Sequence, residues 1–452
     1  MSTSMQRPGA ETISAPKAPT TLAETGLSGE AVTDLIFKIL YVHGAQSGMQ
    51  LSQTIRLPFD IVDEQLLMLQ NRRFVEVVRT FGPARGNYVF DLAGVGRDRA
   101  KAALEASHYV GAAPVPLRVY REWIDKQSVR GLRIGREHIR EGFAHLVIQE
   151  NVLEALGPAV NSASSLFLYG DPGNGKTVIA EAIAAMLGGD IYMPYAVEID
   201  GQEMVLYDPV HHEVVEDEDG QSAESGVAWL HGSSDRDARF LKIKRPVIFV
   251  GGELALGQLD LQYDVYTKIY QAPFQLKACG GVLIIDDFGR QLVPPRDLLN
   301  RWIVPLEKRV DYLTLHTGVK FPVPFDCLLV FATNLNPHDL VDEAFLRRIQ
   351  YKINIDSPAP DAYREIFMRV CDLTGVRFDE AAIRFIYERY YNERGIEPRA
   401  CHPRDIIEHL VHVARYEGIE PRFTPDMLEQ ACESYFLVIA HDLMTELEGY
   451  QP

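Results

Sequence analysis

Residues 170–178 carry the glycine and lysine spacing of a loop that binds phosphate groups. The pattern Gly-x-x-x-x-Gly-Lys-Thr lies between an apolar stretch, 166–169, and an alanine-rich stretch that favours a helix. Glycines let the backbone curl so that successive N–H groups and the positive end of the helix surround a phosphate. The candidate nucleotide-binding residues are therefore Gly170, Asp171, Pro172, Gly173, Asn174, Gly175, Lys176, Thr177 and Val178.

Lys176 and Thr177 end this loop and have separate chemical roles. The ammonium of the lysine contacts the β- and γ-phosphates, and the threonine hydroxyl is a ligand for Mg²⁺. The expected ligands are therefore ATP or GTP together with Mg²⁺, and the residues alone do not distinguish the two nucleotides.

Two further apolar stretches end in polar side chains. Residues 280–285 lead into Asp286 and Asp287, an arrangement in which the first carboxylate holds Mg²⁺ and the second polarises an attacking water. Residues 326–333 lead into Asn334, whose amide we expect beside the γ-phosphate and that water. The three strands together predict phosphoryl-transfer chemistry.

Arginines follow these strands in a fixed order. Arg347 and Arg348 are adjacent, and Arg404 lies at the start of a helix that begins near His402. The complete series of phosphate loop, acidic strand, Thr-Asn strand, arginine pair and late arginine resembles the AAA+ ATPase family over roughly residues 140–440.

The resemblance implies a role for each matching residue. Lys176 would stabilise the reacting phosphates, Asn334 would act as sensor 1, and Arg404 would reach the nucleotide from the lid as sensor 2. Arg348 is the expected arginine finger, with its neighbour Arg347 as the alternative. In this family the finger enters the site of the adjacent subunit, where such a cation contributes ~10³ to 10⁵ in rate. The resemblance thus implies a homo-oligomeric ring, by analogy a hexamer.

The acidic pair departs from the family pattern at its second position. Most active members have Asp-Glu where this chain has Asp286 and Asp287. Aspartate is one methylene shorter, and a displacement of about 1 Å at a reacting group costs ~10²-fold in rate. Slow hydrolysis is therefore possible unless the backbone compensates, and Asp287 remains the expected water-activating residue.

Two segments indicate a branch of the family. Residues 272–281 resemble the segment before the acidic strand in MoxR-type ATPases, magnesium-chelatase motor subunits and bacterial enhancer-binding activators. Residues 309–325 alternate apolar side chains about Gly318, which predicts the hairpin that these proteins insert before sensor 1. The loop with which the activators contact sigma factor is missing, so an activator of that type is not expected.

The ATPase core is expected over residues 161–356, with an insert at about 190–275. Within the insert, Asp200 and Gly201 predict a hairpin turn. Tyr263, Tyr266 and Tyr270 either contact a substrate in a central pore or pack in the core. Residues 357–452 show helix patterns separated by glycines and resemble the helical lid of the family.

The chain before the core divides into three predicted parts. Residues 1–28 have the composition of a disordered tail, and 114–160 are expected to be a linker and nucleotide-pocket segment. Residues 29–113 resemble a winged-helix domain, in which we expect a helix at 59–71 and a hairpin of strands 74–78 and 87–92. The winged-helix-like part has equal numbers of basic and acidic side chains, whereas a DNA-binding module is usually basic. A protein-docking or oligomer-organising role is therefore favoured over DNA binding.

Composition limits the setting. A hydrophobic fraction of 46% is ample for packed cores, and a net charge of −18 opposes indiscriminate binding to nucleic acid or anionic lipid. No apolar run is long enough to enter a membrane, and the 5 cysteines are scattered, so neither disulfides nor a zinc site is indicated. We therefore expect a cytoplasmic protein.

These observations predict an α/β fold: a P-loop NTPase core of the AAA+ type with a parallel sheet, a C-terminal helical lid and an N-terminal winged-helix-like domain. The predicted function is ATP hydrolysis by a ring that remodels or assembles an unidentified protein client, in the manner of a chaperone. The alternative is a nucleotide-controlled switch or DNA-binding regulator in which slow hydrolysis is only a timer.

Overall fold

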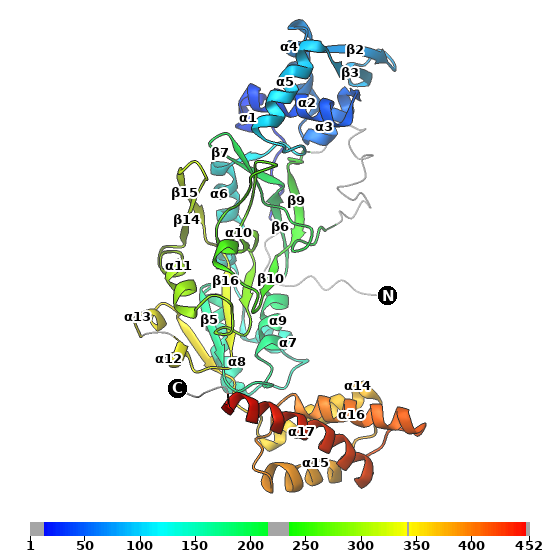
Figure 1. The fold of residues 1–452 in the computed structure, drawn as a ribbon, viewed down its shortest axis with the longest axis vertical. Helices are drawn as coiled ribbons and strands as arrows, with labels where there is room; N and C mark the ends of the chain where they lie inside the picture. The colour runs from blue at the N-terminus through cyan, green and yellow to red at the C-terminus, as the bar shows by residue number, and fades with distance from the viewer. Residues whose placement is uncertain (1–12, 216–234, 341–342, 449–452) are drawn as a thin grey trace.

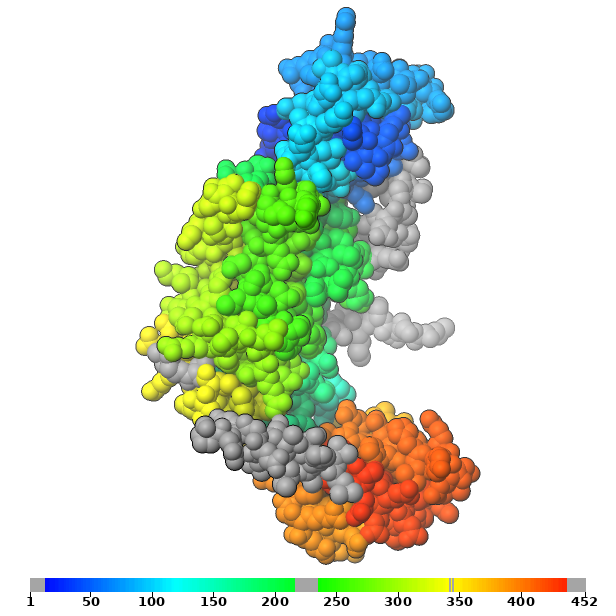
Figure 2. Space-filling model, in the orientation of Figure 1, coloured from blue at the N-terminus to red at the C-terminus, as the bar shows by residue number. Residues whose placement is uncertain are grey.

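The computed structural model describes residues 13–215, 235–340 and 343–448. Its elements form three parts stacked end to end: an N-terminal α/β unit, a central α/β body, and a C-terminal helical unit (Figure 1). The space-filling view in Figure 2 shows the helical unit at the lower end of the body, opposite the N-terminal unit. No helix in the described ranges is both long and apolar enough to cross a lipid bilayer.

The central body contains a five-stranded sheet in which every neighbouring pair is parallel. The strands lie in the order β10 (Val247–Val250), β13 (Val282–Ile285), β16 (Leu328–Thr333), β5 (Ser165–Tyr169) and β17 (Tyr351–Asn354). All residues of β13 and β16 are buried, as expected for parallel strands covered on both faces.

Helices cover both faces of this sheet, and alternate side chains of each strand contact opposite layers. Leu166 and Leu168 belong to the core beneath α7, α8 and α9, whereas Phe167 belongs to the core beneath α11. The bounds are α7 (Arg136–Gly142), α8 (Glu150–Asn161), α9 (Lys176–Leu187) and α11 (Pro295–Lys308), with the short helices α12 (Pro337–Leu340) and α13 (Glu343–Leu346) after β16. The predicted α/β fold class with a parallel sheet is confirmed.

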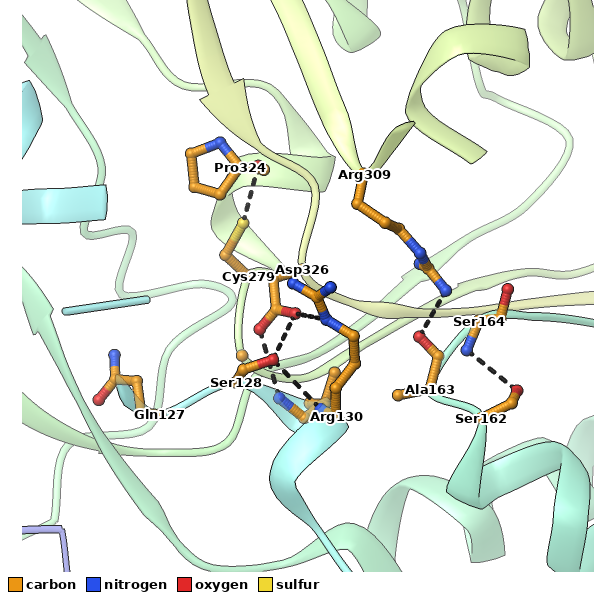
Figure 3. Close-up of polar contacts among 12 residues, drawn as sticks. Gln127, Ser128, Arg130, Ser162, Ala163, Ser164, Cys279, Arg309, Pro324 and Asp326 are labelled. Atoms are coloured by element: carbon orange, nitrogen blue, oxygen red, sulfur yellow. Dashed lines mark hydrogen bonds and ion pairs between the residues drawn. The ribbon is translucent and has the colours of Figure 1, made fainter. Parts of the chain in front are cut away.

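A buried carboxylate holds the segment before β16 against the turn at residues 128–130. Asp326, whose side chain is 4% exposed, accepts hydrogen bonds from Ser128 Oγ at 2.7 Å and from Arg130 Nε at 3.3 Å (Figure 3). Arg309 donates to the carbonyl of Ala163 at 2.9 Å in the same region. These contacts lie before β16 and β5, so they leave the carboxyl ends of the strands available for another purpose.

The predicted insert forms a second sheet above the first. Its order is β11 (Gln262–Asp264), β12 (Ile269–Gln271), β8 (Gln202–Val205), β7 (Ala196–Ile199) and β4 (Val115–Pro116), beside the antiparallel pair β6 (Asp190–Pro194) and β9 (Phe240–Lys244). The predicted turn joins β7 to β8, with φ of 52° at Asp200 and 74° at Gly201. The acidic segment 216–220 belongs to residues 216–234, which lie outside the described residues.

The predicted hairpin before sensor 1 is present as β14 (Val310–Thr314) and β15 (Lys320–Pro324). It packs against the insert: the rings of His316 and Tyr263 stack with centroids 4.1 Å apart, and Tyr270 Oη contacts His316 Nδ1. Tyr270 is buried, while Tyr266 is 84% exposed in the turn between β11 and β12. Packing thus accounts for Tyr263 and Tyr270, and of the three tyrosines only Tyr266 is exposed enough to contact another molecule.

The remaining short elements are α10 (Phe274–Lys277) and the 3-10 turns 129–131 and 256–259.

Residues 114–126, expected to belong to a linker, are part of this second core. Val115 in β4 pairs with β7, and Tyr120 and Ile124 on α6 (Leu117–Lys126) are buried among insert residues. The sequence did not predict this packing, because β4 has only two residues. Its partner strand β7 lies about eighty positions later in the chain.

The N-terminal unit combines a helical group with a three-stranded antiparallel sheet in the order β1-β3-β2. Its elements are α1 (Leu22–Thr25), α2 (Gly29–His43), β1 (Gln46–Ser47), α3 (Gly48–Ile55), α4 (Phe59–Asn71), β2 (Val75–Thr80), a 3-10 turn at 85–87, β3 (Tyr88–Leu92) and α5 (Gly94–Ala106). The predicted helix at 59–71 and the hairpin match α4, β2 and β3.

The expectation of a disordered tail over residues 1–28 needs correction for its second half. Residues 1–12 lie outside the described residues, but Lys17 forms a β-bridge with Arg236, and Leu27 is buried in the N-terminal core. Arg239, itself 3% exposed, forms an ion pair with Asp237 and donates to the carbonyl of Thr25 at 2.9 Å. The segment has few apolar residues of its own and is ordered by the insert strand, which composition alone does not reveal.

The C-terminal unit is helical, as predicted. It comprises α14 (Pro360–Thr374), α15 (Glu380–Ile386) with a π-helical continuation to Asn392, α16 (His402–Glu417) and α17 (Pro425–Glu448). Tyr363, Phe367 and Ile406 lie among its fully buried residues. The unit therefore has a core of its own and meets the central body only along one side (Figure 1).

A close backbone contact in the N-terminal unit gives a stability prediction. A Cβ at Gly96 would lie 1.9 Å from the carbonyl oxygen of Phe74, whereas a Cβ at Gly94 meets nothing within 4 Å. We expect Gly96→Ala to lower the free energy of unfolding by about 1–3 kcal/mol through overpacking. Gly94→Ala is the matched control on the same helix and should be neutral or stabilising by about 0.5 kcal/mol. Guanidinium titration followed by circular dichroism measures both, and equal midpoints would contradict the prediction.

Candidate nucleotide-binding site

The phosphate loop joins the end of β5 to the start of α9. Gly170 and Gly173 have φ of 131° and 82°, conformations that side chains rarely adopt. A Cβ at Gly170 would lie 2.5 Å from the carbonyl oxygen of Ile355, and one at Gly173 would lie 2.6 Å from Cys401 Sγ. Glycine is thus required at both positions, by β17 on one side and by the helical unit on the other.

Lys176 is the first residue of α9 and curls back over the loop. Its side chain donates to the carbonyls of Gly170 at 2.8 Å and Asp171 at 2.7 Å. Burial lowers the pKa of Lys176 from its ordinary value, and the carboxylates of Asp171, Asp286 and Asp287 oppose that shift. The ammonium is therefore held, with little water around it, where phosphate oxygens would meet the loop.

Thr177 and Asp286 meet across the sheet. Thr177 Oγ1 donates to Asp286 Oδ2 at 2.8 Å, and the other carboxylate oxygen of Asp286 accepts from the backbone N–H of Asp287 at 2.9 Å. A hydroxyl and a carboxylate side by side are hard oxygen donors of the kind that Mg²⁺ shares with phosphates and water. The residues present fit this ion.

Asp287 and Asn334 also lie at the carboxyl ends of the strands, beside Asp286 and the phosphate loop. The amide of Asn334 donates to Asp287 Oδ1 at 3.3 Å, and both side chains line the same cleft as Lys176. Asp287 has a φ of 48°, a left-handed conformation that aspartate tolerates better than most residues. The structure thus brings together Lys176, Thr177, Asp286, Asp287 and Asn334, as the spacing of the motifs predicted.

These side chains border a cleft of about 510 Å³, within the range of ~300–1,000 Å³ that is usual for small-molecule sites. One wall comes from residues 145–149 and α8, the floor from the phosphate loop, and the opposite wall from α14 and the start of α16. The wall residues that sequence reasoning missed include Leu146, Ile148, Val152, Ile366, Arg369, Val370 and Cys401. The apolar side chains among them, such as Leu146, Ile148 and Ile366, suit the flat face of a nucleotide base.

The helical unit touches the phosphate loop directly. The N–H of Cys401 donates to the carbonyl of Gly173 at 2.9 Å, and the N–H of Ala400 donates to Asn174 Oδ1 at 3.3 Å. Asn174 Nδ2 in turn donates to Ser357 Oγ at 3.4 Å, at the junction that leads into α14. The phosphate loop and the helical unit are therefore joined by hydrogen bonds at Gly173 and Asn174.

Arg404 lines the cleft from the first turn of α16. Its side chain is 62% exposed, and its Nε donates to Asp405 Oδ1 at 2.9 Å. Arg399, two residues before Cys401, is a second cation near the loop, and its charge lowers the pKa of Lys176. The sequence pointed to Arg404 through its position after His402, but gave no signal for Arg399.

The arginine pair lies away from this cleft. Neither Arg347 nor Arg348 is among the described residues that line it. Arg348 donates through Nε to Glu307 Oε1 at 2.6 Å on α11 and is 17% exposed, whereas Arg347 is exposed. Within one chain the structure therefore does not unite these arginines with the other predicted site residues.

Comparison with known proteins gives limited information. A family described as a domain of unknown function (DUF8689) matches residues 359–434, which lie in the helical unit. No curated protein matches this chain.

Two solved structures share parts of the arrangement. Thermotoga maritima RuvB, a Holliday junction branch migration motor, is 18% identical with a TM-score of 0.35, over 63% of this chain and 69% of that chain. NtrX from Brucella abortus in complex with ADP is 13% identical with a TM-score of 0.37, over 75% of this chain and 60% of that chain. Because both TM-scores lie below 0.5, we draw nothing about activity from these likenesses.

The first prediction concerns ligand binding. Lys176→Ala removes the ammonium that would contact the phosphates, so we expect affinity for Mg-ATP to fall by at least about 10-fold. Titration with a fluorescent ATP analogue, displaced by ATP, measures it. Lys320→Ala, on the exposed face of β15, is the matched control and should bind as the wild type does. Equal affinity of the two variants would show that the loop does not bind phosphates.

Proposed function

We propose that this chain binds and hydrolyses ATP as an AAA+ protein, assembles into a ring, and uses the cycle to remodel or assemble a protein client. The observation that supports it best is the convergence of Lys176, Thr177, Asp286, Asp287 and Asn334 at one end of a parallel sheet. A protein that only binds a nucleotide needs the phosphate loop and Lys176. The carboxylate of Asp287 with the amide of Asn334 beside it serves, in addition, to activate a water molecule.

The chemistry assigns one step to each side chain. Lys176 binds the β- and γ-phosphates and offsets their charge, and the N–H groups of the loop orient them. Asn334 holds the attacking water beside Asp287, whose free carboxylate oxygen accepts the proton as the water attacks the γ-phosphorus. The bond between the γ-phosphorus and the β,γ-bridging oxygen breaks, and ADP and phosphate are released. Mg²⁺, when bound, would be held by Thr177 and Asp286 and would neutralise charge on the phosphates.

The proposed ring explains why the arginine pair lies outside its own cleft. A cation that serves a neighbouring subunit belongs on the surface, at the edge of the sheet that faces that neighbour. Arg347 is exposed and ready for this contact, whereas Arg348 would first leave Glu307. We propose that this pair supplies the finger, with the site complete only when two subunits meet.

The N-terminal unit is the proposed docking domain. Its helix order and its β1-β3-β2 sheet suit a winged helix. Arg85 in the turn before β3 donates to both oxygens of Asp63 on α4, at 2.8 and 2.9 Å. This ion pair occupies a basic residue of the hairpin and places a carboxylate on the helix that would enter a DNA groove, so a protein partner is favoured over DNA.

Tyr266 is the proposed client contact in the insert. It is 84% exposed, beside the 65% exposed Val265, in the turn between β11 and β12. An exposed aromatic at a hairpin turn can grip a polypeptide through apolar contact.

Hydrolysis gives the second prediction for the site. Asp287→Asn keeps the size of the side chain but removes its ability to accept a proton, so kcat for Mg-ATP should fall by about 100-fold or more. Affinity for ATP should change less than about threefold, because Asp287 contacts the water rather than the phosphates. Steady-state phosphate release and analogue titration measure the two quantities. Retention of wild-type kcat would exclude Asp287 as the general base.

Assembly gives a complementation test. Lys176→Ala subunits retain the arginine pair but lack a working loop, and Arg347→Ala/Arg348→Ala subunits have the reverse defect. Each alone should show turnover reduced by ~10³-fold or more, and an equimolar mixture should recover measurable turnover because each donates what the other lacks. The single arginine variants then identify the finger. A mixture as inactive as its parts would mean that the pair does not act between subunits.

A further inference from the structure

The segment after β13 makes a tight turn that carries Asp287. Asp286 and Asp287 end the strand, Phe288 turns inward and is 1% exposed, and Gly289 has a φ of 108°. Phe288 is fixed to β16: its N–H donates to Ala332 O at 2.8 Å, and its carbonyl accepts from Thr333 Oγ1 at 2.6 Å. The turn is therefore anchored on the side that faces the neighbouring strand.

A single side chain spans the opposite side of the turn. Gln291 Nε2 donates to the carbonyls of Asp286 at 2.9 Å and Asp287 at 3.1 Å. Its Oε1 accepts from the N–H of Gly289 at 2.8 Å. The side-chain amide of Gln291 thus forms hydrogen bonds with three consecutive peptide groups, and two of these flank Asp287.

The backbone of Asp287 needs such a partner. Its φ of 48° lies in the left-handed region, which is unfavourable for a residue with a side chain. This conformation sets the direction of the Cα–Cβ bond, and the carboxylate lies 3.3 Å from the amide of Asn334. A short carboxylate therefore reaches its partner through the conformation of the turn rather than through the length of the side chain.

We propose that Gln291 is a positioning residue for ATP hydrolysis, whose two N–H donors hold Asp287 in the orientation that the shorter aspartate requires. The inference rests on the proposed function, because Gln291 acts only through Asp287. Gln291 is not among the described residues that line the cleft, and it contacts Asp286 at the backbone carbonyl rather than at the carboxylate that would hold Mg²⁺, so nucleotide binding should not depend on it.

Two substitutions separate the donors from the rest of the side chain. Gln291→Met keeps its length without polar atoms, and Gln291→Glu keeps the acceptor for Gly289 but removes both donors. We expect each to lower kcat by about 10- to 100-fold, as for a misplaced reacting group, with KM changed less than about threefold. Gln50→Ala is the matched control: Gln50 Oε1 accepts from the N–H of Ser47 in the cap of α3, far from the cleft. It should leave kcat unchanged.

A double-substitution cycle shows whether Gln291 acts through Asp287. In the Asp287→Asn background, Gln291→Met should cause no further loss of kcat, since there is no longer a base to position. Additive losses of kcat in the double variant would overturn the proposal. A rise in KM that accounts for the whole loss of activity would also overturn it, and so would a wild-type kcat in both Gln291 variants.

The outcomes also separate this inference from the proposed function. If Asp287→Asn abolishes ATP turnover while both Gln291 variants keep the wild-type rate, only the proposed role of Gln291 is overturned. Absence of turnover in the wild type, at every protein concentration, would overturn both. Unfolding midpoints measured in parallel ensure that the variants compared are folded.

Discussion

The candidate site depends on the parallel hydrogen bonding of β5, β16 and β13. In this register Tyr169 lies opposite Thr333, and Ile285 lies opposite Phe331, so all three strands end at one edge. Whatever follows each strand is therefore brought together: the phosphate loop, Asn334 and the acidic pair. The buried apolar faces maintain this register, because a slip of one residue would turn every core side chain to the opposite face.

The same edge of the sheet holds the two aspartates, Asp286 and Asp287, in different ways. Asp286 is fixed at both carboxylate oxygens, by Thr177 and by the next N–H. Asp287 is oriented by a left-handed backbone and by a turn bonded on two sides. The reach that glutamate obtains from a methylene is supplied here by the main chain, at a conformational cost that surrounding hydrogen bonds offset.

Contacts at the two ends of the cleft connect it to the rest of the chain. Residues 400 and 401 bind the phosphate loop, and Arg369 on α14 donates to the carbonyl of Ala144 at 2.9 Å. The helical unit is therefore joined to both the loop and the wall of the cleft. At the far side of the body, the carbonyl of Thr267 accepts from the N–H of His108, which links the insert to the N-terminal unit. A change at the nucleotide thus has physical routes to both ends of the molecule.

The sequence by itself determined the elements and residues whose patterns are local. Glycine spacing, apolar runs ending in Asp286 and Asn334, and helix periodicity at 59–71 are properties of short segments, and the structure has each of them in place. Only the tertiary structure decided what depends on contacts that no local pattern records: the order of residues 13–28, the membership of 114–126 in the second core, the apolar wall of the cleft and the hydrogen bonds of Gln291. Burial and hydrogen bonding at the first three come from segments far away in the chain.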